Sequence, residues 1–129
     1  GYTVFFANSS IAISPAIYKK LSFDPVKDFA AISMASSYPF ALVAHPALPV
    51  KTVKDLVALA KSKPNSLDYS SAGTGTMSHM AMEMLRVKTG TRITHLPYKG
   101  AAPASVALLT GESQVAFVVM PVAAPHVRN

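Results

Sequence analysis

The stretch LDYSSAGTGTMSH, from Leu67 to His79, decides the fold. Its first residues, up to Ser71, have the composition of a short strand. The small residues that follow form a turn around Gly73 and Gly75, and Met77 begins a helical pattern that Gly90 ends. A strand that passes through a tight turn into a helix is half of a βαβ unit, so the stretch predicts an α/β fold.

The same alternation extends outward in both directions. We predict strands at 3–7, 29–35, 40–45, 67–71, 93–96 and 115–120, and helices at 11–21, 53–61, 77–88, 102–109 and 121–129. Such alternation predicts a mainly parallel sheet, and right-handed crossovers place helices on both of its faces. In helix 77–88, helical spacing indicates that Met77, Met80 and Met84 pack into the core.

The helix at 53–61 carries the clearest local signals. Thr52 can cap its first turn, and Asp55 three residues later completes an approximate capping box. Leu56 and Ala60 lie on one helical stripe together with Val53 and Val57, which predicts a single buried face.

The loop after Ser71 is the candidate binding site. Two glycines allow a ligand to approach the backbone, and the first helical turn offers unpaired amides at its positive end. Hydroxyl groups add neutral donors, which suits reversible binding of a carboxylate. The candidate residues are Ser71, Ala72, Gly73, Thr74, Gly75 and Thr76, with His79 behind them and Ser78 as a further hydroxyl.

Other kinds of site fit this loop less well. No Gly-Lys-Ser/Thr follows the glycines, and the dinucleotide-binding glycine pattern is incomplete. Ser78 beside His79 suggests a hydrolase, but there is no nucleophile elbow and no evident acidic partner. A plain turn with a capping residue remains an open alternative.

A second strand–loop–helix motif runs from His95 to Pro103. Tyr98 and Lys99 offer an aromatic wall and a cation at the same edge of the sheet, or are simply exposed loop residues. The four histidines of the chain show no short metal-ligand spacing, so no metal site and no cofactor are predicted.

Composition narrows the function classes. The net charge of +6 is compatible with a basic surface or with steering of anionic solutes. The sequence shows no basic face with aromatic or recognition-helix patterning, so nucleic acid is not a predicted partner. The absence of cysteine excludes disulfides and cysteine nucleophiles without fixing a compartment.

The chain resembles the Bug-type receptors of tripartite tricarboxylate transporters. The matching blocks are Gly1–Thr3, Phe23–Phe29, Lys51–Leu56, Ser70–Thr76 with His79, Pro97–Gly100, and Pro121 with Pro125–Val127. Each block is modest, but their order and spacing together are specific.

The resemblance implies one lobe of a type II periplasmic-binding-protein (Venus-flytrap) fold, and a receptor, not an enzyme. Residues 1–22 correspond to a strand and helix of the first lobe or hinge, and residues 23–129 to the second lobe, truncated at its C-terminus. A signal peptide would precede Gly1. The implied function is periplasmic capture of a small carboxylate for membrane transporter subunits, with Asn8 and Ser9 facing the cleft beside the loop.

One departure from the family pattern concerns the ligand. Many relatives carry an Asp-Asn pair where this chain has Val118 and Val119. The loss of an acceptor for an ammonium or hydroxyl group makes an amino acid a less suitable ligand than an unsubstituted carboxylate.

The alternative function is an effector-binding domain of a transcription regulator with the same fold, which a helix-turn-helix in the parent gene would reveal. A lobe without its partner should bind ligand weakly. It should also associate through exposed apolar surface, as a homodimer or by swapping the strand at 3–7.

Overall fold

A computed structural model describes residues 3–127 of the chain as four strands and five helices. The strands are β1 (Phe40–Ala44), β2 (Asp68–Ser71), β3 (Thr94–Pro97) and β4 (Val115–Val119). The helices are α1 (Ser10–Ile17), α2 (Val53–Ser62), α3 (Met77–Thr89), α4 (Ala101–Leu109) and α5 (Met120–Val127). No helix within this described part is both long and apolar enough to cross a bilayer.

The strands form one sheet in the order β1-β4-β2-β3. Strand β2 pairs in parallel with both β3 and β4, whereas β1 runs antiparallel to β4, with Phe40 opposite Val119. The prediction of a mainly parallel α/β sheet is therefore confirmed.

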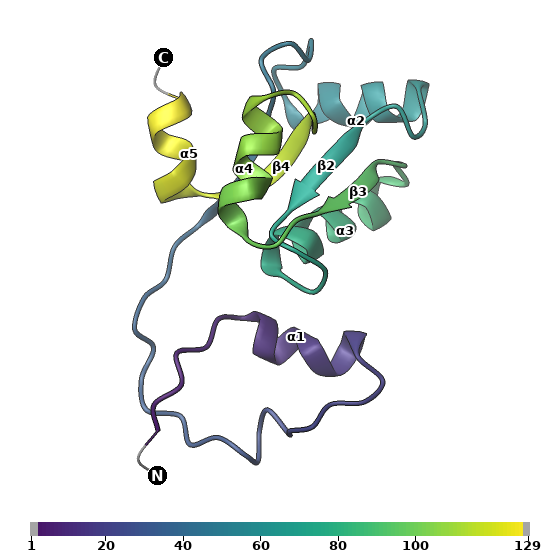
Figure 1. Ribbon diagram of the computed structural model, residues 1–129. Coiled ribbons are helices and arrows are strands. Elements are labelled where there is room, and N and C mark those ends of the chain that lie inside the picture. Colours follow the sequence, from purple (N-terminus) through teal and green to yellow (C-terminus); the bar gives the residue numbers. More distant parts are fainter. Residues whose placement is uncertain (1–2, 128–129) are drawn as a thin grey trace.

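Helices cover both faces of the sheet, as predicted. Successive residues of a strand point to opposite faces. In β2 the Tyr69 hydroxyl donates to Glu83 of α3, while the Ser70 hydroxyl donates to the backbone oxygen of Ala104 in α4. Figure 1 shows the result, with α4 in front of the sheet and α2 and α3 behind it.

The main core lies between the sheet and the helices α2 and α3. Its fully buried members are Leu56, Ala60, Leu67, Tyr69, Met82, Ile93 and Val115. Val53 is 52% exposed, so the buried stripe of α2 is narrower than predicted. In α3 the core methionine is Met82, whereas Met77 and Met84 are exposed and Met80 is half-buried, so the predicted phase of that helix was wrong.

Local signals at the helix ends are confirmed. The Thr52 hydroxyl accepts from the Asp55 amide, and the Asp55 carboxylate accepts from the Thr52 amide, which completes the capping box. Gly90 ends α3 with a left-handed backbone at φ 66°.

The N-terminal segment differs from the prediction. Residues 3–7 and 29–35 are not strands, because a strand needs a neighbouring backbone and neither segment pairs with one in the part of the chain that the structure describes. Their aromatic residues instead pack on one another, with the Phe5 and Phe29 rings 5.8 Å apart. The predicted helix 11–21 ends at Ile17, since no residue of α1 is buried and nothing supports a longer helix.

Helix α1 nevertheless lies against the α/β unit, just below the loop that joins β2 to α3 (Figure 1). A Cβ atom at Gly75 would come within 3.2 Å of the Ile17 Cδ1 atom. The N-terminal segment therefore contacts the loop that the sequence identifies as the candidate site.

The capping box of α2 gives a first prediction. Replacement of Thr52 by alanine removes the acceptor for the Asp55 amide and should lower the free energy of unfolding by about 1 kcal/mol in urea denaturation. The control is Lys54→Ala, an exposed position on the same helix. An equal loss of stability in both variants would contradict this role of Thr52.

Candidate functional site

The carboxyl ends of the three parallel strands lie at one edge of the sheet, and each strand leads into a helix. Strand β2 reaches α3 through residues 72–76, β3 reaches α4 through residues 98–100, and β4 runs directly into α5. The amino-terminal ends of three helices therefore meet at this edge, where they favour a negatively charged group.

Hydrogen bonds within the β2–α3 loop fix its shape. The Ser71 hydroxyl accepts from the Gly73 amide at 3.2 Å, and the Ser78 hydroxyl accepts from the Ala72 amide at 3.2 Å. The Thr76 hydroxyl donates to the Gly73 carbonyl at 2.7 Å. Three of the hydroxyls that the sequence offers as ligand donors are thus engaged inside the loop, and only Thr74 is exposed.

The donors left over are backbone amides. Among the described residues, the N–H groups of Thr74, Met77, Ser78 and His79 have no protein acceptor. They belong to the loop and to the first turn of α3, whose dipole adds to their partial positive charge. The loop therefore presents neutral donors to an anion while its side chains hold the backbone in place.

The β2–α3 and β3–α4 loops are joined through their backbones. The Tyr98 amide donates to the Ser71 carbonyl at 3.0 Å, and the Gly100 amide donates to the Ala72 carbonyl at 3.1 Å. A Cβ atom at Gly73 would lie 3.1 Å from the Tyr98 carbonyl oxygen, and Gly73 has φ 129°. Only glycine fits this position without strain.

Tyr98 therefore contributes to the loop through its main chain. Interaction with the Glu112 carboxylate raises the pKa of the Tyr98 phenol.

Behind the loop, three rings stack between β2, β3 and α3. The ring centroids of His79 and His95 are 4.3 Å apart, and those of His95 and Tyr69 are 4.7 Å apart. The His79 Nδ1 atom accepts from the Gly75 amide at 3.2 Å, and the His95 Nε2 atom lies 2.6 Å from the Ser71 hydroxyl oxygen. Both imidazoles thus contact the loop.

Glu83 connects this stack to the middle of α3. Its carboxylate accepts from the Tyr69 hydroxyl at 2.5 Å and pairs with Arg86. Burial acts to raise the pKa of Glu83, but the bonds from Tyr69 and Arg86 outweigh it and hold the pKa below its usual value. Burial and the nearby Glu83 carboxylate raise the pKa of Tyr69, so its hydroxyl remains a donor.

His95 joins the candidate site through its contact with Ser71, whereas sequence reasoning identifies it only as the start of the second motif. Its contact with Ser71 depends on the register of β2 and β3, which places Tyr69 opposite His95. The pair of Ser71 and His95 is not arranged for hydrolysis, because Ser71 is only 1% exposed and a substrate cannot reach it. The Ser78 hydroxyl contacts Ala72 and Thr76, not His79.

Asn8 and Ser9 lie at the amino-terminal end of α1, where the Asn8 side chain accepts from the Ser10 amide at 2.9 Å. Both are exposed. Helix α1 meets the loop at its other end, through Ile17, and eight helical residues extend about 12 Å.

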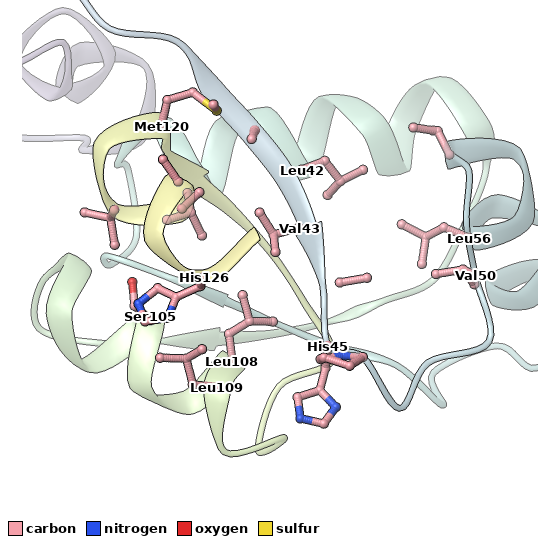
Figure 2. Close-up of a pocket in the computed structure, with 18 of the residues that line it drawn as sticks. Leu42, Val43, His45, Val50, Leu56, Ser105, Leu108, Leu109, Met120 and His126 are labelled. Atoms are coloured by element: carbon pink, nitrogen blue, oxygen red, sulfur yellow. The ribbon is translucent and has the colours of Figure 1, made fainter. Parts of the chain in front are cut away.

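A cavity of about 610 Å³ lies along β1 between the start of α2, α4 and α5. Figure 2 shows its aliphatic lining, including Leu42, Val43 and Leu108, with His45 and His126 at its margin. None of the sequence-predicted site residues lines it, and the capping box closes the amino-terminal end of α2. Lys51, Thr52 and Ser105 add polar groups to this lining.

A second cavity, of about 30 Å³, adjoins the candidate loop. Ser71 and Ala72 line it on one side, and Val118 and Val119 line it on another. Among the described residues, no group of three or more His, Cys, Asp or Glu side chains is arranged to hold a metal ion.

His95 gives a prediction for pH-dependent stability. Burial, reinforced by the charge of His79, lowers the pKa of His95 from 6.5 to about 4 in the folded state. Between these values the unfolded chain binds more protons, so the free energy of unfolding should fall as the pH is lowered from 6.5 toward 4. Urea denaturation of the His95→Gln variant should show a smaller fall over this range, and an unchanged pH dependence would contradict the assignment.

Comparison with known proteins gives a consistent result. The profile of the family described as "Tripartite tricarboxylate transporter family receptor" (TctC) matches residues 1–129. Protein BugT of Bordetella pertussis is 29% identical over 131 residues, which cover 100% of this chain and 40% of that protein. A protein encoded in the gbd 5' region of Cupriavidus necator is 39% identical over 110 residues, which cover 85% of this chain and 33% of that protein.

Solved structures resemble the chain over most of its length. The R. palustris protein Rpa4515 with adipate has a TM-score of 0.86 at 29% identity, over 93% of this chain and 40% of that one. MatC of Rhodopseudomonas palustris with bound malate has a TM-score of 0.82 at 26% identity, over 90% of this chain and 40% of that one. The periplasmic binding protein BugD has a TM-score of 0.81 at 26% identity, over 87% of this chain and 38% of that one.

The chain thus spans 40% or less of the length of each of these relatives. Its fold matches part of the periplasmic binding proteins, and the family match extends from its first residue to its last. The chain belongs to the TctC family of solute-binding receptors of tripartite tricarboxylate transporters.

Proposed function

We propose that this chain is the second lobe of a periplasmic receptor that captures a small carboxylate and delivers it to the membrane subunits of a tripartite transporter. Members of the family are receptors and not enzymes. The observation that carries the proposal is that the amides of Thr74, Met77, Ser78 and His79 have no acceptor within residues 3–127, in a loop whose own side chains fix its shape.

The ligands of structural relatives support this class of solute. Rpa4515 is described with adipate and MatC with malate, and both molecules carry two carboxylates. A carboxylate accepts several hydrogen bonds at once, so a cluster of backbone donors at a helix end is well suited to it.

The charge distribution also favours an anion. No acidic residue occurs between Asp68 and Glu83, or between Glu83 and Glu112, so both loops at this edge lack carboxylates of their own. Lys99 is exposed on the β3–α4 loop, and the whole chain carries a net charge of +6. The resulting field attracts anionic solutes toward the edge.

The second cavity bears on the choice of ligand. Val118 and Val119 line it together with Ser71 and Ala72, and the side chains of the two valines cannot accept a hydrogen bond. An ammonium or hydroxyl group bound beside the valines would lose a partner from water without gaining one from these two side chains. We therefore expect an unsubstituted carboxylate to bind in preference to an amino acid.

In this proposal residues 1–22 belong to the first lobe or hinge and residues 23–129 to the second lobe. The remaining contacts, including those of Asn8 and Ser9, form when both lobes close on the ligand and exclude water. The chain alone therefore supplies half of a binding site.

Two left-handed glycines provide a matched test in the receptor that carries this chain. Gly73→Ala places a Cβ against the Tyr98 carbonyl and disturbs the loop, whereas Gly90→Ala meets no atom within 4 Å and lies at the far end of α3. Both substitutions strain the backbone by about 1 kcal/mol or more. Calorimetric titration with adipate and malate should show affinity reduced by about tenfold or more only in Gly73→Ala.

A receptor that binds neither dicarboxylate, or that binds an amino acid more tightly than both, would contradict the proposed ligand class. Equal affinities of the Gly73→Ala and Gly90→Ala variants would contradict the proposed loop.

Self-association of the isolated chain is a further expectation. Val4, Phe5 and Phe6 are 81%, 63% and 78% exposed, and such apolar surface drives association. Because the segment at 3–7 is not a strand, we expect association through these side chains in place of a strand swap. Light scattering should detect dimers or larger species, and a monomer at high concentration would contradict this.

A further inference from the structure

We propose that His79 and His95 are positioning residues of the β2–α3 loop, with neutral His79 holding the Gly75 amide and His95 supporting its ring. Protonation of His79 then releases the loop. The proposed function bears only on how this release affects ligand affinity, because the response of the loop itself needs no ligand.

The contact between Gly75 and His79 defines the required charge state. The Gly75 N–H group can donate to the His79 Nδ1 atom, at 3.2 Å, only if that nitrogen carries no proton. A protonated imidazole has a donor on each nitrogen, so Nδ1–H would oppose the Gly75 N–H group. Protonation therefore replaces a hydrogen bond with a contact between two donors.

His95 reinforces this arrangement from the neighbouring strand. Its ring lies between those of His79 and Tyr69, and its Nε2 atom contacts the Ser71 hydroxyl. That hydroxyl in turn accepts from the Gly73 amide. The two imidazoles thus hold the two glycines of the loop, one directly and one through Ser71.

The groups that face His79 can be traced element by element. Tyr69 comes from β2, His95 from β3, and Glu83 and Arg86 from α3 itself. Strand β4 and helix α1 contain no titratable side chain. Glu83 lies 3.9 Å from the His79 Nε2 atom, but it already binds Tyr69 and Arg86, so it does not replace the lost contact with Gly75.

The release affects the donors proposed to bind the ligand. Gly75 lies between Thr74 and Met77, whose amides are unpaired among the described residues. When Gly75 is no longer held, these amides lose their fixed direction and must be ordered again by the ligand. The expected loss is that of one hydrogen bond, about fivefold in affinity.

The primary experiment follows the loop without ligand, in the receptor that carries this chain. Nuclear magnetic resonance of ¹⁵N-labelled protein should show the Gly75 amide resonance shifting together with the His79 ring nitrogens as the pH is lowered. His79→Asn keeps an acceptor that does not titrate, so its Gly75 resonance should stay constant. His79→Leu has no acceptor and should show the acid-state resonance at every pH.

The second measurement is affinity for adipate and malate at one pH above and one pH below the observed change in the Gly75 resonance. The affinity of the His79→Asn variant also changes with pH, because the ligand itself becomes protonated, and this change is subtracted. After the subtraction, wild-type receptor should bind about fivefold more weakly at the lower pH. His126→Gln, at an exposed position on α5, is the matched histidine control and should behave like wild type. Circular dichroism confirms that each variant is folded.

Three results would overturn the inference. The Gly75 resonance could fail to follow His79, or the His79→Asn variant could retain the full pH dependence of that resonance. Acidification could also tighten ligand binding, as expected if a charged His79 attracted the ligand directly. A receptor that binds neither dicarboxylate, yet whose Gly75 resonance follows His79, would contradict the ligand class and support the positioning role.

Discussion

The close approach of the Tyr98 carbonyl oxygen to Gly73 is the constraint on which the candidate site depends. A Cβ atom at Gly73 would lie 3.1 Å from that oxygen, so the β2–α3 and β3–α4 loops can meet only around a glycine. Their contact allows the Tyr98 and Gly100 amides to bind the first loop, and it brings the starts of α3 and α4 to one edge of the sheet. The anion binding that we propose for this edge follows from this arrangement of backbone, and it needs no contact between a cationic side chain and the ligand.

The polar groups behind the loop form a continuous series of contacts from the surface of α3 to the glycines. Arg86 pairs with Glu83, Glu83 accepts from Tyr69, and Tyr69 stacks on His95, which contacts both His79 and Ser71. Most polar atoms of this series have a partner, which lets them be buried without a large penalty, and the Nε atom of Arg86 is the buried exception in the series. The loop is therefore shaped from behind by side chains and presents backbone amides in front. This separation explains how a site of small residues can be rigid.

Much of the fold could be predicted from the sequence because the decisive signals are local. Thr52 and Asp55 mark the start of α2, Gly90 marks the end of α3, and the alternation of strands and helices specifies a mainly parallel sheet. The wrong predictions concern tertiary context. Residues 3–7 have strand composition but do not pair with another strand among the described residues. In α3 the methionine that faces the core of the protein is Met82, and not Met84. The loop itself was identified by its glycines, but the role of His95 depends on strand register, and the internal use of the Ser71 and Thr76 hydroxyls depends on loop geometry. Neither can be read from residue type and spacing.

The central claim is that backbone amides of this loop bind a carboxylate, and a crystal structure of the receptor carrying this chain, grown with adipate, tests it most directly. The account predicts carboxylate oxygens at about 2.7–3.2 Å from at least two of the amide nitrogens of Thr74, Met77, Ser78 and His79. It also predicts the Gly75 amide still bound to His79, since that contact sets the direction of its neighbours. Adipate bound with its carboxylates away from this loop, for example in the aliphatic cavity along β1, would contradict the account.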